Sequence, residues 1–323
     1  MLTIHYIFIF LILSIAICSH CPIFKCGSLL KENQCISHTS SEEKNEYLIN
    51  LCPKDKFCDY SMDPTQSEIF CSNKPKTLLV DNEDCSSAKD CYSSQCIDGK
   101  CKGKGINEAC SNTGECEIGL YCKNSKCQNQ EKQGGVCFQD SDCQNNYGCS
   151  DNKTCIEYFT LEVGDKSTNY MLCKTMYTYE GYCSNLISKS GKDECDENDN
   201  KCIFTIDSGN QKISEITKNC QCSRGDNTKK YCPLDTNGKI WKDMVNKLKL
   251  FFTQKGNNFH STRRNSFDYE TKKAFYYAVN YPKYKNADSC AIDIDLNDSE
   301  SGNNFFFLKF HHLVIFSLIF CLF

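Results

Sequence analysis

Continuous apolar segments occupy the two ends of this chain, and mostly polar sequence lies between them. Near the start, Ile7–Ile17 has the length expected for the hydrophobic part of a secretory signal peptide. Ala16-Ile17-Cys18 places small residues before a cleavage point, although no Lys or Arg precedes the apolar run. The pattern predicts a signal peptide over residues 1–18, and an uncleaved membrane anchor is the alternative.

The second apolar segment covers residues 305–323. Lys309, His311 and His312 interrupt it and no basic segment follows, so it fits a membrane-spanning helix poorly. It fits a glycosylphosphatidylinositol (GPI) attachment signal better, because small residues precede an uninterrupted apolar stretch by a spacer. The predicted lipid-attachment residues, in a linker at 293–304, are Ser301, Gly302 and Asn303, with Asp298 and Ser299 as alternatives. A membrane span and an unanchored secreted chain remain open.

Between the two ends, periodic apolar positions are concentrated in residues 157–292. Residues 239–254 place their apolar side chains at intervals of three and four, which predicts an amphipathic helix. A shorter helix is predicted over Tyr269–Val279, and strands over Tyr158–Val163 and Ile203–Ile206. This part of the chain is therefore expected to form a small mixed α+β domain that also contains cysteines.

The chain has 28 cysteines, twelve of which form three similar blocks within residues 80–156. These are Cys85, Cys91, Cys96, Cys101; Cys110, Cys116, Cys122, Cys127; and Cys137, Cys143, Cys149, Cys155. A fixed period of about 26 residues is typical of small modules that are cross-linked because each is too small to bury a core. The predicted fold class is therefore small disulfide-rich modules in tandem, followed by the mixed domain.

Turn-forming residues lie between the last two cysteines of every block: Asp98-Gly99, Asn124-Ser125 and Asp151-Asn152. Asp-Gly readily adopts the positive φ angles of a two-residue hairpin turn. Each block is accordingly predicted to be a short hairpin cross-linked to a preceding loop. Four cysteines allow three pairings, and the sequence does not choose among them.

The segment 19–79 has six cysteines at irregular spacing and no long apolar pattern. No helix or strand of any length is predicted here, and the polar run 39–46 is interpreted as a surface loop. Cysteine numbers are even in this segment, in the repeats and in the region that follows. Even numbers in all three predict three separately cross-linked regions.

The density of cysteines and the predicted signal peptide favour an oxidising, extracellular compartment. Zinc binding is disfavoured, because the only C-x2-C pair is Cys18/Cys21 at the signal cut and few histidines are present. The net charge of −4 is scattered along the chain, which argues against a nucleic-acid partner. Asn152 and Asn297 begin glycosylation sequons.

No catalytic, cofactor or metal site is predicted. His260 is the main histidine to consider as a base, but a histidine beside a serine does not make a triad, and we interpret it as a surface or core-edge residue. Arg263-Arg264 is interpreted as a solvated pair. The acidic runs 193–200 and 293–298 are rich in oxygen ligands for calcium but lack the glycine and terminal glutamate spacing of an EF-hand loop, so both are interpreted as solvated loops. Cys220 and Cys222 are expected to enter different disulfides.

The C-x5-C-x4-5-C pattern of the repeats, with Asp90, Glu115 or Asp142 before the second cysteine, resembles the N-terminal cysteine-rich module of Dickkopf proteins and similar EB-type modules. The resemblance covers residues 85–155, and no second Dickkopf-type domain is recognisable, so receptor antagonism is not carried over. The layout of the chain also resembles cysteine-rich surface proteins of ciliated protozoa, which implies a location more than an activity.

The sequence thus predicts a non-enzymatic, membrane-attached cell-surface protein that acts as a coat, adhesion or recognition molecule. Its expected partners are the membrane, through a GPI lipid or a C-terminal span, and an extracellular protein or glycan. The alternatives are a secreted inhibitor or receptor ligand that acts through the repeat loops, a single-pass membrane protein, and an enzyme within residues 157–292.

Overall fold

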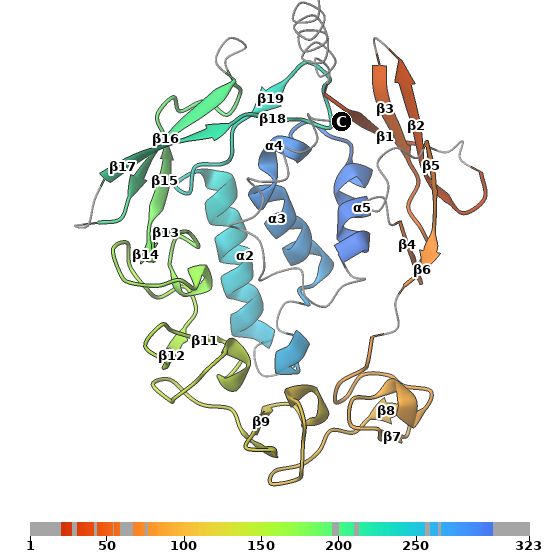
Figure 1. The fold of residues 1–323 in the computed structure, drawn as a ribbon, viewed down its shortest axis with the longest axis vertical. Coiled ribbons are helices and arrows are strands. Elements are labelled where there is room, and N and C mark those ends of the chain that lie inside the picture. Colours follow the sequence, from red (N-terminus) through yellow and green to blue (C-terminus); the bar gives the residue numbers. More distant parts are fainter. Residues whose placement is uncertain are drawn as a thin grey trace, which may run out of the picture. The chain divides into compact units, whose positions relative to one another are not determined.

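The computed structural model describes residues 21–27, 31–41, 44–53, 55–58, 67–74, 77–195, 200–209, 213–255, 259–263 and 266–299. The predicted signal peptide, the apolar tail and the lipid-attachment residues Ser301, Gly302 and Asn303 lie outside these ranges. The chain forms two compact units (Figure 1). Unit 1 combines residues 1–75, 220–231 and 281–323, and unit 2 combines residues 76–219 and 232–280. Each unit therefore joins segments that the sequence analysis assigned to different regions.

Unit 1 contains a four-stranded sheet with the order β1-β3-β2-β5, in which β1 and β3 are parallel and the other pairs antiparallel. The strands are β1 (Ile23–Cys26), β2 (Gln34–Ser41), β3 (Lys44–Ile49) and β5 (Glu68–Phe70); β4 (Lys56–Phe57) pairs with β6 (Ser72–Asn73). The surface loop predicted at 39–46 is wrong for its described residues, because residues 39–41 belong to β2 and residues 44–46 to β3. The buried pair Ile36 and Ile49 sets the register, and the polar residues extend the same ladder.

The C-terminal segments complete unit 1. Their elements are β18 (Gln221–Cys222), β19 (Lys230–Tyr231), α4 (Tyr281–Tyr284) and α5 (Ser289–Ser299). Ala291 and Ile294 of α5 share a core with Phe24, Ile36 and Ile49 of the sheet. Helix α5 includes residues 293–298, so the solvated loop predicted there is wrong: its apolar residues pack on the sheet, and this burial stabilises the helix.

Two disulfides join the N-terminal segment of unit 1 to its later segments, Cys21–Cys222 and Cys26–Cys290. Cys35–Cys58 and Cys52–Cys71 are local to the N-terminal segment. The prediction of three separately cross-linked regions is therefore wrong. The numbers of cysteines remain even because each of the two long-range disulfides takes one cysteine from the N-terminal segment and one from the C-terminal region.

The three predicted repeats lie in unit 2 and have the same disulfide pairing, first to third and second to fourth. The bonds are Cys85–Cys96, Cys91–Cys101, Cys110–Cys122, Cys116–Cys127, Cys137–Cys149 and Cys143–Cys155. Each repeat is a short hairpin preceded by a loop with one 3₁₀ turn, which confirms the predicted small disulfide-rich modules. The hairpins are β7 (Cys96–Ile97)/β8 (Lys100–Cys101), β9 (Leu120–Lys123)/β10 (Lys126–Asn129) and β11 (Tyr147–Cys149)/β12 (Cys155–Glu157); the turns are η1 (Ala88–Asp90), η2 (Thr113–Glu115) and η3 (Asp140–Asp142).

The acid before the second cysteine holds the 3₁₀ turn of each repeat. The Asp90 carboxylate accepts hydrogen bonds from the backbone N–H groups of Ser86 and Ser87. In the third repeat, the Asp142 carboxylate accepts the equivalent hydrogen bonds from the N–H groups of Phe138 and Gln139. A carboxylate that accepts otherwise unpaired N–H groups at the start of a turn stabilises it as a helix cap does. The recurring acid therefore has a structural role.

A fourth segment with the same architecture follows at residues 161–183. It contains η4 (Tyr170–Leu172) and the hairpin β13 (Thr178–Tyr179)/β14 (Tyr182–Cys183). Its parallel bridge Leu161–Cys173 corresponds to the bridge Leu79–Cys91 of the first repeat. Its antiparallel bridge Lys166–Tyr182 corresponds to Asp84–Lys100. The disulfide Cys173–Cys183 corresponds to the second bond of the other repeats. These residues lie within the mixed domain predicted over 157–292, so the repeats extend further along the chain than the cysteine spacing indicates.

Ser167 and Thr178 occupy the positions of the missing first disulfide in the fourth repeat. The Ser167 N–H donates to Gly181 O, and in the first repeat the Cys85 N–H donates to Gly99 O in the same way. Thr178 lies opposite Cys183 in its hairpin, as Cys96 lies opposite Cys101 in the first repeat. We expect the double variant Ser167→Cys/Thr178→Cys to form a disulfide and to raise the free energy of unfolding by about 3 kcal/mol. Denaturant titration of the oxidised and reduced variant measures the gain. Two thiols that remain free under oxidising conditions would contradict the equivalence.

The rest of unit 2 contains a three-stranded antiparallel sheet and two helices. The sheet has the order β15 (Asn185–Ser188), β16 (Lys201–Asp207), β17 (Ile213–Asn219), and the helices are α2 (Lys239–Lys255) and α3 (Tyr269–Val279). Strand β16 and both helices form where the sequence predicts them. The predicted strand at Tyr158–Val163 is wrong, since Phe159 has a φ of 61° and turns the chain. The rings of Tyr158 and Phe159 instead pack on Phe252 of α2.

Candidate functional site

The four repeats follow one another beside α2 and the segment that succeeds it (Figure 1). Every repeat contributes a polar or backbone contact to these C-terminal residues. From the first repeat to the fourth, the contacts are Glu83 with Arg263 (2.9 Å), Cys116 O with His260 Nε2 (3.0 Å), Asn145 Nδ2 with Phe259 O (2.7 Å) and Thr175 O with Trp241 Nε1 (2.7 Å). The repeats and the helical segment thus form one folded body rather than separate modules.

His260 is a structural residue of this contact. Its side chain is only 2% exposed. Because Cys116 O can only accept, Nε2 carries the proton, and Nδ1 accepts from the backbone N–H of Thr262. Burial lowers the pKa of the imidazole, which agrees with this neutral form. The prediction of a surface or core-edge position is wrong, since the sequence around residue 260 does not reveal that a distant repeat covers the ring.

Arg263 is not part of a solvated pair, which corrects the prediction for this residue. Its guanidinium makes a two-point contact with Glu83, Nε to Oε1 and Nη2 to Oε2, each 2.9 Å, and it also donates to Leu78 O. Burial acts to raise the pKa of the Glu83 carboxyl, but the hydrogen bonds from Arg263 outweigh it and hold that pKa below its usual value. Arg264 lies outside the described residues.

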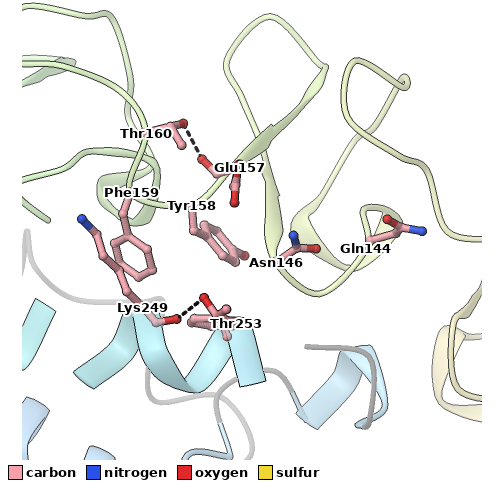
Figure 2. Close-up of a pocket in the computed structure, with 9 residues that line it drawn as sticks. Gln144, Asn146, Glu157, Tyr158, Phe159, Thr160, Lys249 and Thr253 are labelled. Carbon is pink, nitrogen blue, oxygen red and sulfur yellow. Dashed lines mark hydrogen bonds between the residues drawn. The ribbon is translucent and has the colours of Figure 1, made fainter. Parts of the chain in front are cut away.

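A pocket of about 430 Å³ opens between α2 and the third repeat, together with residues 158–160 that link this repeat to the fourth (Figure 2). The rings of Tyr158, Phe159 and Phe252 form its apolar part, with centroids 5.0 Å apart for Tyr158 and Phe252. The other lining residues are polar or charged: Gln144, Asn146, Glu157, Thr160, Lys249 and Thr253. Because the three aromatic side chains are almost fully buried, they offer a ligand little ring surface.

The polar part of this pocket offers both charges and hydrogen-bonding groups. Glu157 and Lys249 supply opposite charges, and Asn146 and Gln144 supply amides, so a small polar molecule can find donors and acceptors here. Lys249 Nζ lies 5.9 Å from the Phe159 ring centroid, in the range of a cation–π contact.

The predicted modification sites lie apart from this pocket. Asn152 is exposed at the turn of the third hairpin. Asn297 lies in the last turn of α5, and its side chain is outside the described part of the structure. Cys222 pairs with Cys21, and Cys220 is bonded to a different cysteine, which confirms that these neighbours enter different disulfides. Of the acidic run 193–200, residues 196–199 are not described.

Sequence reasoning missed a buried charged cluster in unit 1. Arg224 and Asp295 lie 3.0 Å apart with side chains 8% exposed, and Lys283 and the Tyr284 hydroxyl also reach Asp295. The guanidinium carbon lies 3.9 Å from the Phe24 ring centroid. The prediction that Asp295 is part of a solvated loop is therefore wrong. The alternation of Ile292, Ile294 and Leu296 with acids lacks the three- and four-residue spacing of an amphipathic helix, so the sequence did not indicate α5.

No family model, curated protein or solved structure matches this chain. The similarity of the repeats to Dickkopf-type and EB-type modules consequently stays a prediction. Within the part of the chain that the structure describes, no helix combines the length and hydrophobicity needed to cross a membrane.

Proposed function

We propose that this chain is a non-enzymatic cell-surface protein, attached by a GPI lipid and acting as a coat, adhesion or recognition molecule. One observation carries the proposal: all 26 cysteines between Cys21 and Cys290 are paired in thirteen disulfides. Such extensive bonding fits an extracellular protein, because the cytosol keeps thiols reduced. The apolar segments at residues 1–18 and 305–323 are consistent with entry into the secretory pathway and with attachment at the surface.

The side chains also favour a binding role over an enzymatic one. His260, the main histidine considered as a base, is buried with both ring nitrogens hydrogen-bonded, so it cannot take a proton from a substrate in this fold. A repeat with two disulfides retains its shape without a large core, which suits a coat exposed to solvent and proteases. We infer that the tandem repeats and the helical segment act as one stiff body that displays the loop surface of the repeats.

Treatment of intact cells with phosphatidylinositol-specific phospholipase C tests this proposal. The full chain carries an epitope tag inserted in the Glu42-Glu43 segment, and surface biotinylation identifies the exposed fraction. We expect the lipase to release the biotinylated protein. The matched control, in which Ser301, Gly302 and Asn303 are replaced by bulky residues, should not appear in the released fraction. Retention of the wild-type chain at the surface would favour a membrane span, and recovery without enzyme would favour the secreted inhibitor or ligand.

A further inference from the structure

The third repeat exposes two large apolar side chains beside a glycosylation sequon. Val136 is 60% exposed and Phe138 is 77% exposed, while Cys137 between them is fully buried. Because side chains alternate along an extended segment, the buried cysteine directs both neighbours outward. We call these two residues the apolar pair of the third repeat.

The fold does not require apolar residues at these positions. Val136 forms an antiparallel bridge with Thr154. In the other repeats, the corresponding bridges place Asp84, Ala109 and Lys166 at the position of Val136. The residues equivalent to Phe138, two positions further along, are Ser86, Ser111 and Thr168. All of these side chains are exposed and small or polar, so the same backbone forms without the apolar pair. An exposed apolar cluster that the fold does not need points to a function.

The same repeat differs from the others in its hairpin turn. Five residues separate Cys149 from Cys155, against four between the corresponding cysteines of the first two repeats. This longer turn contains the sequon Asn152-Lys153-Thr154, and the Asn152 side chain is exposed. Asp151 accepts hydrogen bonds from the backbone N–H and hydroxyl of Thr168, which fixes the turn against the fourth repeat.

The backbone pairing brings the sequon and the apolar pair together. Val136 lies opposite Thr154, and the Cys137 N–H donates to Lys153 O at 3.0 Å. The pairing ends at Lys153, which has a φ of 60° and donates its N–H to Ser150 O, so Asn152 lies in the turn that adjoins this end of the pair. Asn152 and Phe138 are the chain neighbours of the hydrogen-bonded residues Lys153 and Cys137, so a glycan on Asn152 starts close enough for its first sugars to reach the Phe138 ring.

We propose that Asn152 carries an N-linked glycan whose first sugar rings pack on Phe138 and Val136. Passage through the secretory pathway, on which this inference rests, is part of the proposed function. The C–H groups on one side of a sugar ring are attracted to the negatively polarised face of an aromatic ring. A protein partner is disfavoured, since a stable interface buries roughly 800 Å² on each side, far more than two adjacent side chains supply.

The test uses the full chain expressed in eukaryotic cells, with hydroxyl-radical footprinting read by peptide mass spectrometry. We expect glycopeptides that contain Asn152, and a several-fold rise in labelling of Phe138 in Asn152→Gln. Labelling of Tyr269, an exposed aromatic residue outside the repeats, should not change. Asn297→Gln, which removes the other sequon, should leave the labelling of Phe138 at the wild-type level.

A stability cycle gives a second readout. Phe138→Ser introduces the residue found in the first two repeats, so the variant is expected to fold. Removal of the glycan by Asn152→Gln should lower the melting temperature of the chain that retains Phe138. The same removal should leave the melting temperature of the Phe138→Ser chain unchanged. An unmodified Asn152 in chains recovered from the cell surface would overturn the glycan and leave the proposed function standing. Equal labelling of Phe138 with and without the glycan would overturn the packing, and protection in both forms would indicate a protein partner instead.

A chain retained in the cytosol would contradict the proposed function itself. In that case the same chain is directed into the secretory pathway by a host signal peptide. Glycopeptide analysis and footprinting of this secreted chain still show whether Asn152 is modified and whether the glycan covers Phe138.

Discussion

Replacing Asp295 by asparagine is expected to lower the free energy of unfolding of unit 1 by about 3–5 kcal/mol. The substitution keeps the size of the side chain and removes its charge, so Arg224 stays buried without its counter-ion. Arg224 also donates to Ala291 O at 3.0 Å and lies over the Phe24 ring. It cannot move to solvent without disrupting the contact between α5 and the sheet.

Hydrogen exchange in the peptides of β1 and α5 measures this loss in unit 1. Glu68→Gln is the matched control, because its partner Lys31 lies 2.8 Å away and both side chains are exposed. Exposed ion pairs contribute about 0–1 kcal/mol, so exchange should hardly change in the control. Equal effects of the two substitutions would contradict the role of burial.

The same carboxylate makes unit 1 sensitive to acid. Burial alone would raise the pKa of Asp295, but the charges of Lys283 and Arg224 outweigh it and hold the pKa well below its ordinary value. Folding therefore favours the ionised form. The stability that it contributes is complete above the unfolded-state pKa of about 3.9 and is lost as the pH falls toward the folded-state value. In Asp295→Asn this part of the acid dependence should be absent.

Local signals in the sequence predicted the local elements well. The intervals of apolar residues predicted α2 and α3, and Asp98-Gly99 predicted a turn in which both residues have positive φ, 51° and 76°. The spacing of the cysteines predicted the repeats but not their pairing, because any of the three pairings can close a block of this length. The fourth repeat was missed because Ser167 and Thr178 replace two of its cysteines. The interval from Cys173 to Cys183, which equals that from Cys91 to Cys101, was the available signal.

The long-range contacts could not be predicted from the sequence. Nothing near Cys26 indicates that its partner is Cys290, and nothing near His260 indicates that its ring donates to Cys116 O. Such contacts arise when segments far apart in the chain bury a common apolar surface, as β1 and α5 do. Sequence periodicity reports which face of an element is apolar, but not which distant element covers that face.

Removal of both long-range disulfides of unit 1 is expected to have the largest effect. Cys21–Cys222 and Cys26–Cys290 span 201 and 264 residues. In the chain-entropy model, each restricts the unfolded chain more strongly than a short-range bond does. While Cys21–Cys222 is present, however, Cys26–Cys290 closes a much shorter loop. That loop passes through the first disulfide and contains only residues 21–26 and 222–290. Replacing the cysteines of one bond by alanine should therefore cost about 4 kcal/mol.

Loss of both bonds should cost about 10 kcal/mol, which is comparable to the whole stability of a typical domain. We therefore expect unit 1 to lose its hydrogen-exchange protection in the quadruple alanine variant, with the N-terminal sheet separating from α5. Replacing Cys173 and Cys183 by alanine is the control, since that bond spans 10 residues and should cost about 3 kcal/mol in unit 2. A quadruple variant in which β1 and α5 stay protected would show that the shared core, rather than the two covalent links, holds these two elements together.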